Sequence, residues 1–367
     1  MKFFHSVFDY FQILGQNRQK RNKFIKLMSR LAENKSGGNT YQDETTQQLQ
    51  QLAQNMEKIT QMNELKQQQA HEAKRLTFEN IGLENISVSQ LKEMFGKTRL
   101  VILCGPQTRA HEIGCELQKI MRLKDFCEIG KSGRNVTLEN SAKKFLEISV
   151  STFDGCKQIF IQYIKSDLMI LRISEAIKQV QMIRIGSAGG IGVEAGSIVV
   201  TSHIVNPITL KSEWTYYSCG NCITQPCTFD GNISEQLYFI AKNKQIPVFL
   251  GKTMTTETYY EGQARLDGAL CTYTQEAKLE WLTKLYKQGV RNFEMEGDVL
   301  SGMCTYNEIP CAMLCVAYLD RLEMDTTPSK YTKQELDSWM QRCVDVVVTY
   351  TKKHLSSKKK KSKPQTS

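Results

Sequence analysis

The chain of 367 residues is long enough for one large domain or two small ones, and its 41% hydrophobic and 23% charged residues are typical of a globular protein. Its apolar runs are far shorter than a membrane span, so we expect no transmembrane helix. The net charge of +10 belongs to the ends, because residues 1–30 hold seven Lys and Arg against one acid and residues 352–367 hold seven Lys and no acid. The slightly acidic remainder argues against a nucleic-acid-binding face on the globular part.

The twelve cysteines are scattered, many of them in apolar segments, and no secretory signal precedes them, which predicts free thiols in a reducing compartment. Cys219, Cys222 and Cys227 form a cluster without a fourth ligand at matching spacing, so a loop of thiols is favoured over a zinc site. The basic, aromatic residues 1–30 suit a mitochondrial presequence, a surface-binding segment or a plain extension. We expect a cytoplasmic protein, with a mitochondrial one as the alternative.

The two ends of the chain differ from its middle. Residues 1–75 form a basic and then Gln-rich extension, in which the apolar positions of 42–69 span barely two heptads and favour a solvated helix over a coiled coil. Residues 352–367 form a Lys-rich tail, which we interpret as solvated, with binding to a polyanion or a larger assembly as the alternative.

From about residue 75 strand-like and helix-like blocks alternate, which predicts an α/β fold. Short apolar runs predict strands over 100–104, 181–185, 197–201 and 311–317. Apolar residues at three- and four-residue steps predict helices over 158–180 and 333–354. Thr274 is a suitable N-cap for another helix that runs through Tyr286 and that Gly289 closes.

The densest glycine cluster follows Arg184. Residues 190–195 match the dinucleotide-binding string, but a predicted strand follows them instead of the helix that would hold the pyrophosphate. An arginine at a strand end beside small residues suits an oxyanion instead. Gly105 and Arg109 repeat the arrangement at the start of a predicted helix. The two together predict a phosphate-type ligand.

Two further segments carry polar side chains at short spacing. Gln263 and Arg265 lie two residues apart in an expected extended segment, where an amide and a guanidinium can recognise the edge of a pyrimidine; the alternative is an ordinary polar loop. Glu294 and Glu296 lie at a strand-to-helix junction, where they could hold a metal or sugar hydroxyls, or simply favour the helix dipole.

Three segments together resemble one family. Residues 184–192 (Arg-Ile-Gly-Ser-Ala-Gly-Gly-Ile-Gly), 260–271 (Tyr-Glu-Gly-Gln-Ala-Arg-Leu-Asp-Gly-Ala-Leu-Cys) and 289–296 (Gly-Val-Arg-Asn-Phe-Glu-Met-Glu) strongly resemble animal-type uridine phosphorylases of the nucleoside phosphorylase superfamily. The resemblance covers 76–351 and implies a single α/β domain with a central twisted mixed β-sheet flanked by helices, preceded by a helical or disordered extension. It implies reversible phosphorolysis of uridine to uracil and ribose 1-phosphate, with no cofactor and no metal.

The resemblance also implies a set of site residues. The catalytic ones are Arg184, Glu296 and Arg265, because cleavage through an oxocarbenium-like sugar needs a placed anion and a stabilised leaving base. Phosphate would be bound by Gly105, Arg109, Arg134, Arg184 and Ser187, with Arg134 lent across the interface of a homodimer. Ribose would be bound by Met295 and Glu296, and the base by Tyr259, Gln263, Arg265 and Arg321.

Three features depart from the family. Residues 151–157 (Ser-Thr-Phe-Asp-Gly-Cys-Lys) replace a glycine turn, residues 78–83 lack the histidine expected for the 5′-hydroxyl, and Asp320 stands where pyrimidine enzymes carry Asn. An acid at this position is typical of purine-acting relatives. The alternatives are therefore a catalytically inactive structural or assembly subunit and a purine-preferring phosphorylase.

Overall fold

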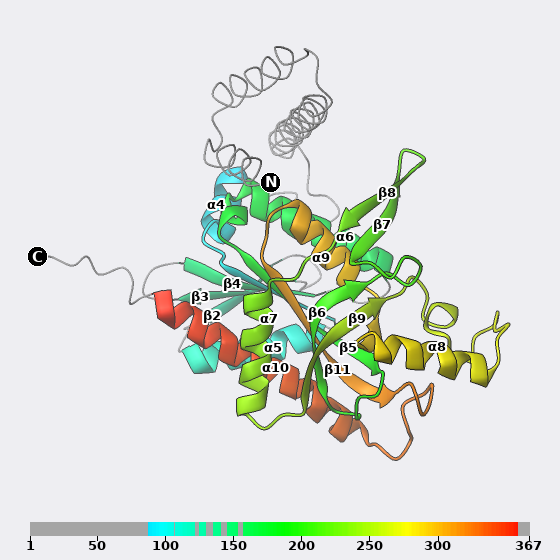
Figure 1. Cartoon of the computed structure of the whole chain (residues 1–367). Coiled ribbons are helices and arrows are strands. Elements are labelled where there is room, and N and C mark those ends of the chain that lie inside the picture. Colours follow the sequence, from blue (N-terminus) through cyan, green and yellow to red (C-terminus); the bar gives the residue numbers. More distant parts are fainter. Residues whose placement is uncertain are drawn as a thin grey trace, which may run out of the picture. The chain divides into compact units, whose positions relative to one another are not determined.

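The computed structural model describes residues 87–105, 107–121, 125–129, 135–140, 145–152 and 157–358 (Figure 1). The predicted extension 1–75, the end of the Lys-rich tail, Arg134, residues 78–83 and residues 153–156 of the altered turn lie outside the described residues. The structural statements below concern the described part of the chain.

A nine-stranded mixed sheet forms the centre, in the order β10-β9-β6-β11-β5-β1-β4-β3-β2. Its strands are β1 Leu100–Cys104, β2 Asp125–Ile129, β3 Asn135–Asn140, β4 Phe145–Thr152, β5 Gln181–Gly190, β6 Ile198–Val205, β9 Val248–Thr255, β10 Val290–Glu294 and β11 Cys311–Asp320. The strand β5 pairs in parallel with both β1 and β11. The buried middle of the sheet explains why these strands are continuous apolar runs instead of alternating ones.

The sheet closes on itself at one end. Beyond its pairing with β1, the C-terminal part of β5 also pairs antiparallel with β10, where Asn292 faces Gly190 and Phe293 faces Gly189. The strands β5, β11, β6, β9 and β10 therefore form a closed ring. This closure brings the middle of β5 and the end of β10 together, although they lie about a hundred residues apart in the sequence.

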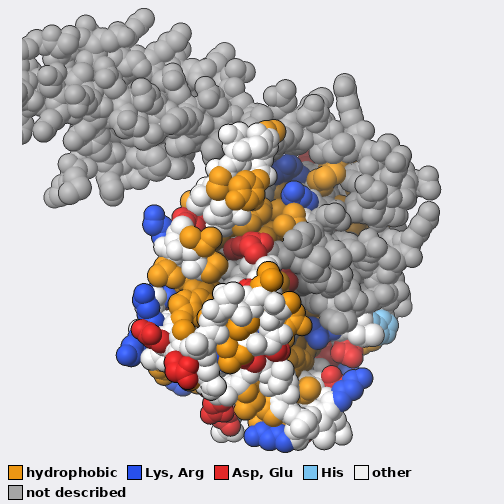
Figure 2. Space-filling model, turned by 90° about the vertical axis from the view of Figure 1, so that its right-hand side faces the viewer, with side chains coloured by type: hydrophobic (Ala, Val, Ile, Leu, Met, Phe, Trp, Pro, Cys, Tyr) orange, Lys and Arg blue, Asp and Glu red, His pale blue; other side chains and the backbone are white. Residues whose placement is uncertain are grey.

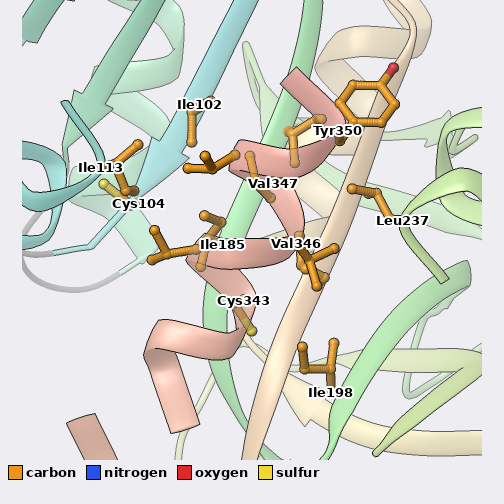
Figure 3. Close-up of a cluster of buried hydrophobic side chains, with 14 of the residues drawn as sticks. Ile102, Cys104, Ile113, Ile185, Ile198, Leu237, Cys343, Val346, Val347 and Tyr350 are labelled. Atoms are coloured by element: carbon orange, nitrogen blue, oxygen red, sulfur yellow. The ribbon is translucent and has the colours of Figure 1, made fainter. Parts of the chain in front are cut away.

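Helices cover both faces of the sheet (Figure 1). They are α4 Val88–Phe95, α5 Gln107–Met121, α6 Lys157–Ile173, α7 Gly231–Asn243, α8 Gln275–Lys287, α9 Gly297–Tyr306 and α10 Lys333–Lys358. Alternate residues of β1 point to opposite faces, as the pleat requires. Ile102 packs with α5, α7 and α10 in one core cluster (Figure 3), whereas Val101 packs with α6 and α9 in another.

Most predicted elements are confirmed, with longer or shorter bounds. The strands begin at or within one residue of the predicted starts, but β5, β6 and β11 each extend three to five residues further. The helix predicted over 158–180 ends at Ile173 and is followed by a separate 3₁₀ turn, Ala176–Lys178. Thr274 caps α8 by accepting a hydrogen bond from the Ala277 N–H, as expected. The predicted α/β fold with a mixed sheet and flanking helices is confirmed.

A β-hairpin projects from the sheet and carries the cysteine cluster. Its strands are β7 Glu213–Ser218 and β8 Asn221–Pro226. Cys219 lies in its turn and Cys222 in β8, both exposed, whereas Cys227 is buried and donates to the backbone carbonyl of Asp298 over 3.3 Å. Within the described residues, no group of three or more His, Cys, Asp and Glu side chains is placed to hold a metal ion.

The surface of the described part mixes charges of both signs. Figure 2 shows Lys and Arg side chains next to Asp and Glu side chains, with hydrophobic side chains between them, on the face that it presents. No helix in the described part is both long enough and apolar enough to span a bilayer.

Candidate functional site

A cavity of about 420 Å³ opens beside β5. This volume lies within the range of pockets that bind small molecules. Its walls come from β5, from the ends of β1 and β10, from the loop before α8 and from the segment that follows β11. Among the residues that line it are Gly105, Arg109, Arg184, Ser187, Tyr259, Gln263, Arg265, Glu294, Met295 and Glu296.

Arg184 lines this cavity and is buried. Its Nη2 donates to Glu296, and its Nη1 lies 3.1 Å from Oε2 of Glu294. Burial disfavours the charged form, but these two carboxylates outweigh it and raise the pKa of Arg184 above its ordinary value. We call the three residues the arginine–glutamate cluster; it holds a permanent cation beside two carboxylates.

Glu294 is fixed by three donors besides Arg184. It accepts a hydrogen bond from the Thr255 hydroxyl at 2.6 Å and from the backbone N–H groups of Glu296 and Gly297 at 2.9–3.0 Å. These N–H groups open α9, where the positive end of the helix dipole favours an anion. The predicted junction of two carboxylates is thus a helix start. Glu294 accepts from the N–H groups of that start, and both carboxylates line the cavity.

The glycine after Arg184 makes room for its guanidinium. A Cβ atom on Gly186 would lie 2.6 Å from Nη1 of Arg184 and 3.0 Å from Sγ of Cys315. The prediction that Arg184 ends a strand beside exposed N–H groups is wrong, because β5 continues to Gly190 and pairs with β11 throughout this segment. The glycines serve side-chain packing here, and neither a dinucleotide turn nor an open anion nest is present.

The segment that follows β1 forms the adjacent wall. Gly105 comes directly after the strand, and Arg109 lies in the first turn of α5. Both line the cavity together with Ser187, which is exposed on β5. The structure therefore brings four of the five residues predicted for phosphate to one cavity, and the fifth, Arg134, lies outside the described residues.

Gln263 and Arg265 form a second part of the cavity wall, which we call its base end, and we call the two residues the amide–guanidinium pair. The extended conformation predicted for them is wrong: Glu261–Gln263 is a 3₁₀ turn, followed by Ala264 with a left-handed φ of 52°. Both side chains are buried and both line the cavity all the same. The turn, and not the strand period, places them together.

A second loop holds this pair. Arg321 donates from Nη2 to the backbone carbonyl of Gln263 at 2.7 Å, and its Nη1 lies 3.4 Å from Oε1 of that residue. Arg265 donates from Nη2 to the backbone carbonyl of Asp325. Arg321 is fully buried and does not line the cavity, so it reaches a ligand there only through Gln263. Burial lowers the pKa of Arg321, with Asp325 opposing that shift.

Two further predicted residues lie at the cavity wall. The ring of Tyr259 stacks against the guanidinium of Arg265, whose Cζ lies 4.1 Å from the ring centroid. Met295, which lies between Glu294 and Glu296 in the sequence, is half-buried and lines the cavity. Tyr259 is 48% exposed, so it stands at the mouth of the cavity instead of its floor.

Sequence reasoning missed Asp325 and Lys278. Asp325 accepts from Lys278 Nζ at 2.7 Å, from Arg321 at 2.9 and 3.1 Å and from the Leu266 N–H at 3.0 Å. The spacing of four residues between Arg321 and Asp325 is the one signal in the sequence that could have indicated their pairing. The contact with Lys278 spans 47 residues and left no such signal.

Asp320, which raised the alternative of purine chemistry, is engaged elsewhere. Its Oδ1 accepts hydrogen bonds from the backbone N–H groups of Gly192 at 2.9 Å and Leu322 at 3.0 Å. Asp320 is not one of the described residues that line the cavity. Its carboxylate therefore links the segment after β5 to the segment after β11 by hydrogen bonds to their backbone N–H groups.

The chain is similar to proteins of one superfamily. The family model described as "Phosphorylase superfamily" matches residues 166–352. Uridine phosphorylase 2 of Mus musculus is 32% identical over 267 residues, which cover 72% of this chain and 82% of that protein. Inactive uridine phosphorylase B of Schistosoma mansoni is 29% identical over 240 residues, which cover 64% of this chain and 78% of that protein.

A solved structure shows the same likeness. Isoform 2 of uridine phosphorylase from Schistosoma mansoni, in complex with citrate, superposes with a TM-score of 0.66 at 26% identity, covering 72% of this chain and 90% of that one. The resemblance inferred from three short sequence segments is therefore confirmed over most of the described part of the chain.

Proposed function

Because the chain belongs to the uridine phosphorylase family, within the phosphorylase superfamily, we propose that it catalyses the reversible phosphorolysis of uridine to uracil and ribose 1-phosphate. One observation carries the proposal: the arginine–glutamate cluster and the amide–guanidinium pair line the same cavity. This gives the cavity an anion-binding end, a polar middle and an end that can recognise an amide-like base.

Phosphate is bound at the end formed by Arg184 and Arg109. A guanidinium donates to two phosphate oxygens at once, which fixes the anion against the anomeric carbon. Since Arg184 also contacts Glu294 and Glu296, its position is set before phosphate arrives. Such preorganisation is the main source of electrostatic catalysis.

The ribose lies next to Glu296, whose carboxylate faces the cavity. Carboxylate oxygens accept hydrogen bonds from vicinal hydroxyls, so Glu296 binds the 2′- and 3′-hydroxyls while it keeps its contact with Arg184. The sugar develops positive charge as the glycosidic bond breaks, and a nearby carboxylate stabilises that charge.

The base lies against Gln263 and Arg265. The amide of Gln263 both donates and accepts, which suits the alternating carbonyl and N–H groups of uracil. Arg265 only donates and stabilises the negative charge that develops on the uracil oxygens as the base departs. Phosphate is itself the nucleophile, so no covalent enzyme intermediate is required.

The charge balance at the phosphate end supports a homodimer. Of the described residues that line this end, Arg109 and Arg184 are matched by Glu294 and Glu296, which leaves no net positive charge for a phosphate dianion. We propose that Arg134 of a second copy supplies it. Light scattering coupled to gel filtration should give twice the chain mass, and Arg134→Ala should raise the KM for phosphate more than the KM for uridine.

The activity is tested by following uracil release from uridine by its absorbance change, with and without phosphate, and with inosine run in parallel. Phosphate-dependent release of uracil is the expected result. Release of hypoxanthine from inosine but no release of uracil from uridine would establish a purine-preferring phosphorylase, against which the backbone contacts of Asp320 argue.

A catalytically inactive structural subunit is the second candidate. It is favoured by the replacement of the glycine turn at 151–157 and by the likeness to an inactive relative. No product from either nucleoside, together with no thermal stabilisation by millimolar phosphate and uridine, would support it over the enzyme.

We also propose the division into an extension over 1–75, a phosphorylase domain over 76–351 and a Lys-rich tail over 352–367. The extension and the tail are the parts with unbalanced charge and Gln-rich composition. Limited proteolysis should cut first within them and leave a fragment close to 76–351. An early cut inside that range would contradict the division.

A further inference from the structure

Asp325 is the point where the two loops at the base end of the cavity meet. It lies in the segment between β11 and α10, whereas Gln263 and Arg265 lie in the segment between β9 and α8. Every acceptor of Asp325 is in use: both carboxylate oxygens and the backbone carbonyl oxygen receive contacts from described residues.

The contacts of Asp325 reach each member of the amide–guanidinium pair by a separate path. Its carbonyl oxygen accepts directly from Nη2 of Arg265. Its Oδ1 lies 3.1 Å from Nε and 2.9 Å from Nη2 of Arg321, and Arg321 in turn donates to the backbone carbonyl of Gln263 at 2.7 Å. Asp325 therefore contacts Arg265 directly and Gln263 through Arg321, whose Nη1 also lies 3.4 Å from Oε1 of Gln263. The nitrogen of that amide donates to the Thr256 hydroxyl at 3.3 Å, so Asp325 and Thr256 together set its orientation.

The carboxylate of Asp325 also balances buried charge. Lys278 on α8 and Arg321 are both buried, and both contact the same Oδ1. Uncompensated buried cations are costly, so removal of this carboxylate frees both side chains to move towards water. Oδ2 meanwhile accepts the N–H of Leu266 at 3.0 Å, which ties the backbone just after Arg265 to the second loop.

We propose that Asp325 is a positioning residue that sets the orientation of Gln263 and Arg265 and thereby determines the selectivity of the site for a pyrimidine base. The inference rests on the proposed function. Asp325 does not line the cavity, so it acts through its neighbours and not by touching substrate. Selectivity follows from orientation, because the amide distinguishes bases only when its oxygen and nitrogen are held apart in known places.

The test is steady-state kinetics of Asp325→Asn, which keeps the shape of the side chain and removes its charge. We expect the KM for uridine to rise by about tenfold and the uridine-to-inosine ratio of kcat/KM to fall by about as much, which corresponds to loss of one charge-assisted contact. The KM for phosphate should change by less than about twofold, because the contacts of Asp325 are with Arg265, Leu266, Lys278 and Arg321 and not with the arginines proposed to bind phosphate. A merely structural role would not produce this split.

Two matched variants separate positioning from stability. Glu323→Gln removes a negative charge from an exposed side chain of the same segment and should leave all constants as in the wild type. Lys278→Met removes a buried partner of Asp325 and should lower the Tm while preserving the uridine-to-inosine ratio, because the contacts of Asp325 with Arg321 and Arg265 remain. If Asp325→Asn lowers the Tm like Lys278→Met and leaves KM and selectivity unchanged, the proposal is overturned.

Calorimetric titration with uracil and with inorganic phosphate distinguishes failure of the inference from failure of the proposed function. A wild-type protein that binds uracil without turning over uridine would overturn the proposed function alone. In that case Asp325→Asn must weaken uracil binding by about tenfold and leave phosphate binding unchanged for the inference to stand. A wild-type protein that does not bind uracil overturns both.

Discussion

At one end of the cavity, Arg184 is held by carboxylates that project from a closed sheet and the helix start that follows it, whereas at the other end Gln263 and Arg265 lie on a loop that a second loop holds in place. The charge balance also differs. Two carboxylates surround one guanidinium at the first end, while Asp325 faces Arg321 and Lys278 at the second. The sheet-built end, formed by Arg184 and its two carboxylates, suits a compact anion, and the loop-built end, formed by Gln263 and Arg265, presents donors and an acceptor that suit a base.

The largest effect should come from the sheet-built end. Arg184→Lys keeps the positive charge but loses the bidentate guanidinium donor. We expect kcat/KM for uridine to fall by about a hundredfold, or roughly 3 kcal/mol. Assays over a series of phosphate concentrations measure it. Arg184→Ala is the poorer test because it leaves Glu294 and Glu296 buried without their cation and should destabilise the fold as well.

An unchanged kcat/KM in Arg184→Lys would contradict the difference drawn between the two ends. It would show that a positive charge alone binds phosphate at the sheet-built end and that the geometry of the guanidinium does not matter. Circular dichroism and the Tm of the variant provide the control for folding. Both should stay close to those of the wild type.

The next effect concerns stability at the loop-built end. The Leu266 N–H, Lys278 and Arg321 outweigh burial and lower the pKa of Asp325 in the folded protein. Its stabilisation is therefore present in full above the ordinary aspartate value of 3.8 and is lost as the pH falls through the folded pKa. Asp325→Asn should lower the free energy of unfolding by roughly 2 kcal/mol at pH 7, and by less at pH 3.

Urea unfolding at both pH values measures this difference. The control Glu323→Gln should stay within about 0.5 kcal/mol of the wild type at pH 7, as expected of an exposed position. An Asp325→Asn defect that is equally large at pH 3 would mean that shape, and not charge, joins the two loops.

A smaller effect should follow from the glycine that admits Arg184. Gly186→Ala places a methyl group 2.6 Å from Nη1 of Arg184, so the guanidinium must shift. We expect a loss of about tenfold in kcat/KM, mostly as a higher KM for phosphate. Gly231→Ala is the matched control, because a Cβ atom there meets nothing within 4 Å. Equal activity of the two variants would show that the sheet tolerates displacement of its arginine.

The difference between the two ends also explains what could be predicted from the sequence. The identities of Arg184, Gln263 and Arg265 follow from contiguous motifs, and the short apolar runs predict the strands that carry the first of them. The path of β5 beyond Arg184 depends on its pairing with β10, where Phe293 faces Gly189 across a hundred residues of sequence. Local pattern carries no information on such a pairing, so the sequence predicts a strand over 181–185 and not its continuation to Gly190.

The supporting contacts of the loop-built end were beyond prediction for the same reason. Asp325 meets Arg265 and Leu266 across 60 and 59 residues and Lys278 across 47. Taken alone, an aspartate or a lysine at these positions is typical of a polar surface segment. Only the folded arrangement shows that an acid after β11 and a lysine on α8 serve one purpose.

The smallest effect tests the aromatic ring at the mouth of the cavity. Tyr259 stacks on Arg265 at 4.1 Å and is 48% exposed, and a cation–π contact at such a site contributes about 0.5–1 kcal/mol. Tyr259→Ala should therefore raise the KM for uridine by roughly threefold and leave the KM for phosphate unchanged. Tyr260→Ala is a close control, because this neighbour is 45% exposed and does not line the cavity. If Tyr259→Ala instead matched Arg184→Lys in its effect, the ring would be a main determinant of base binding, and the loop-built end would depend on its mouth more than on the contacts of Asp325 behind it.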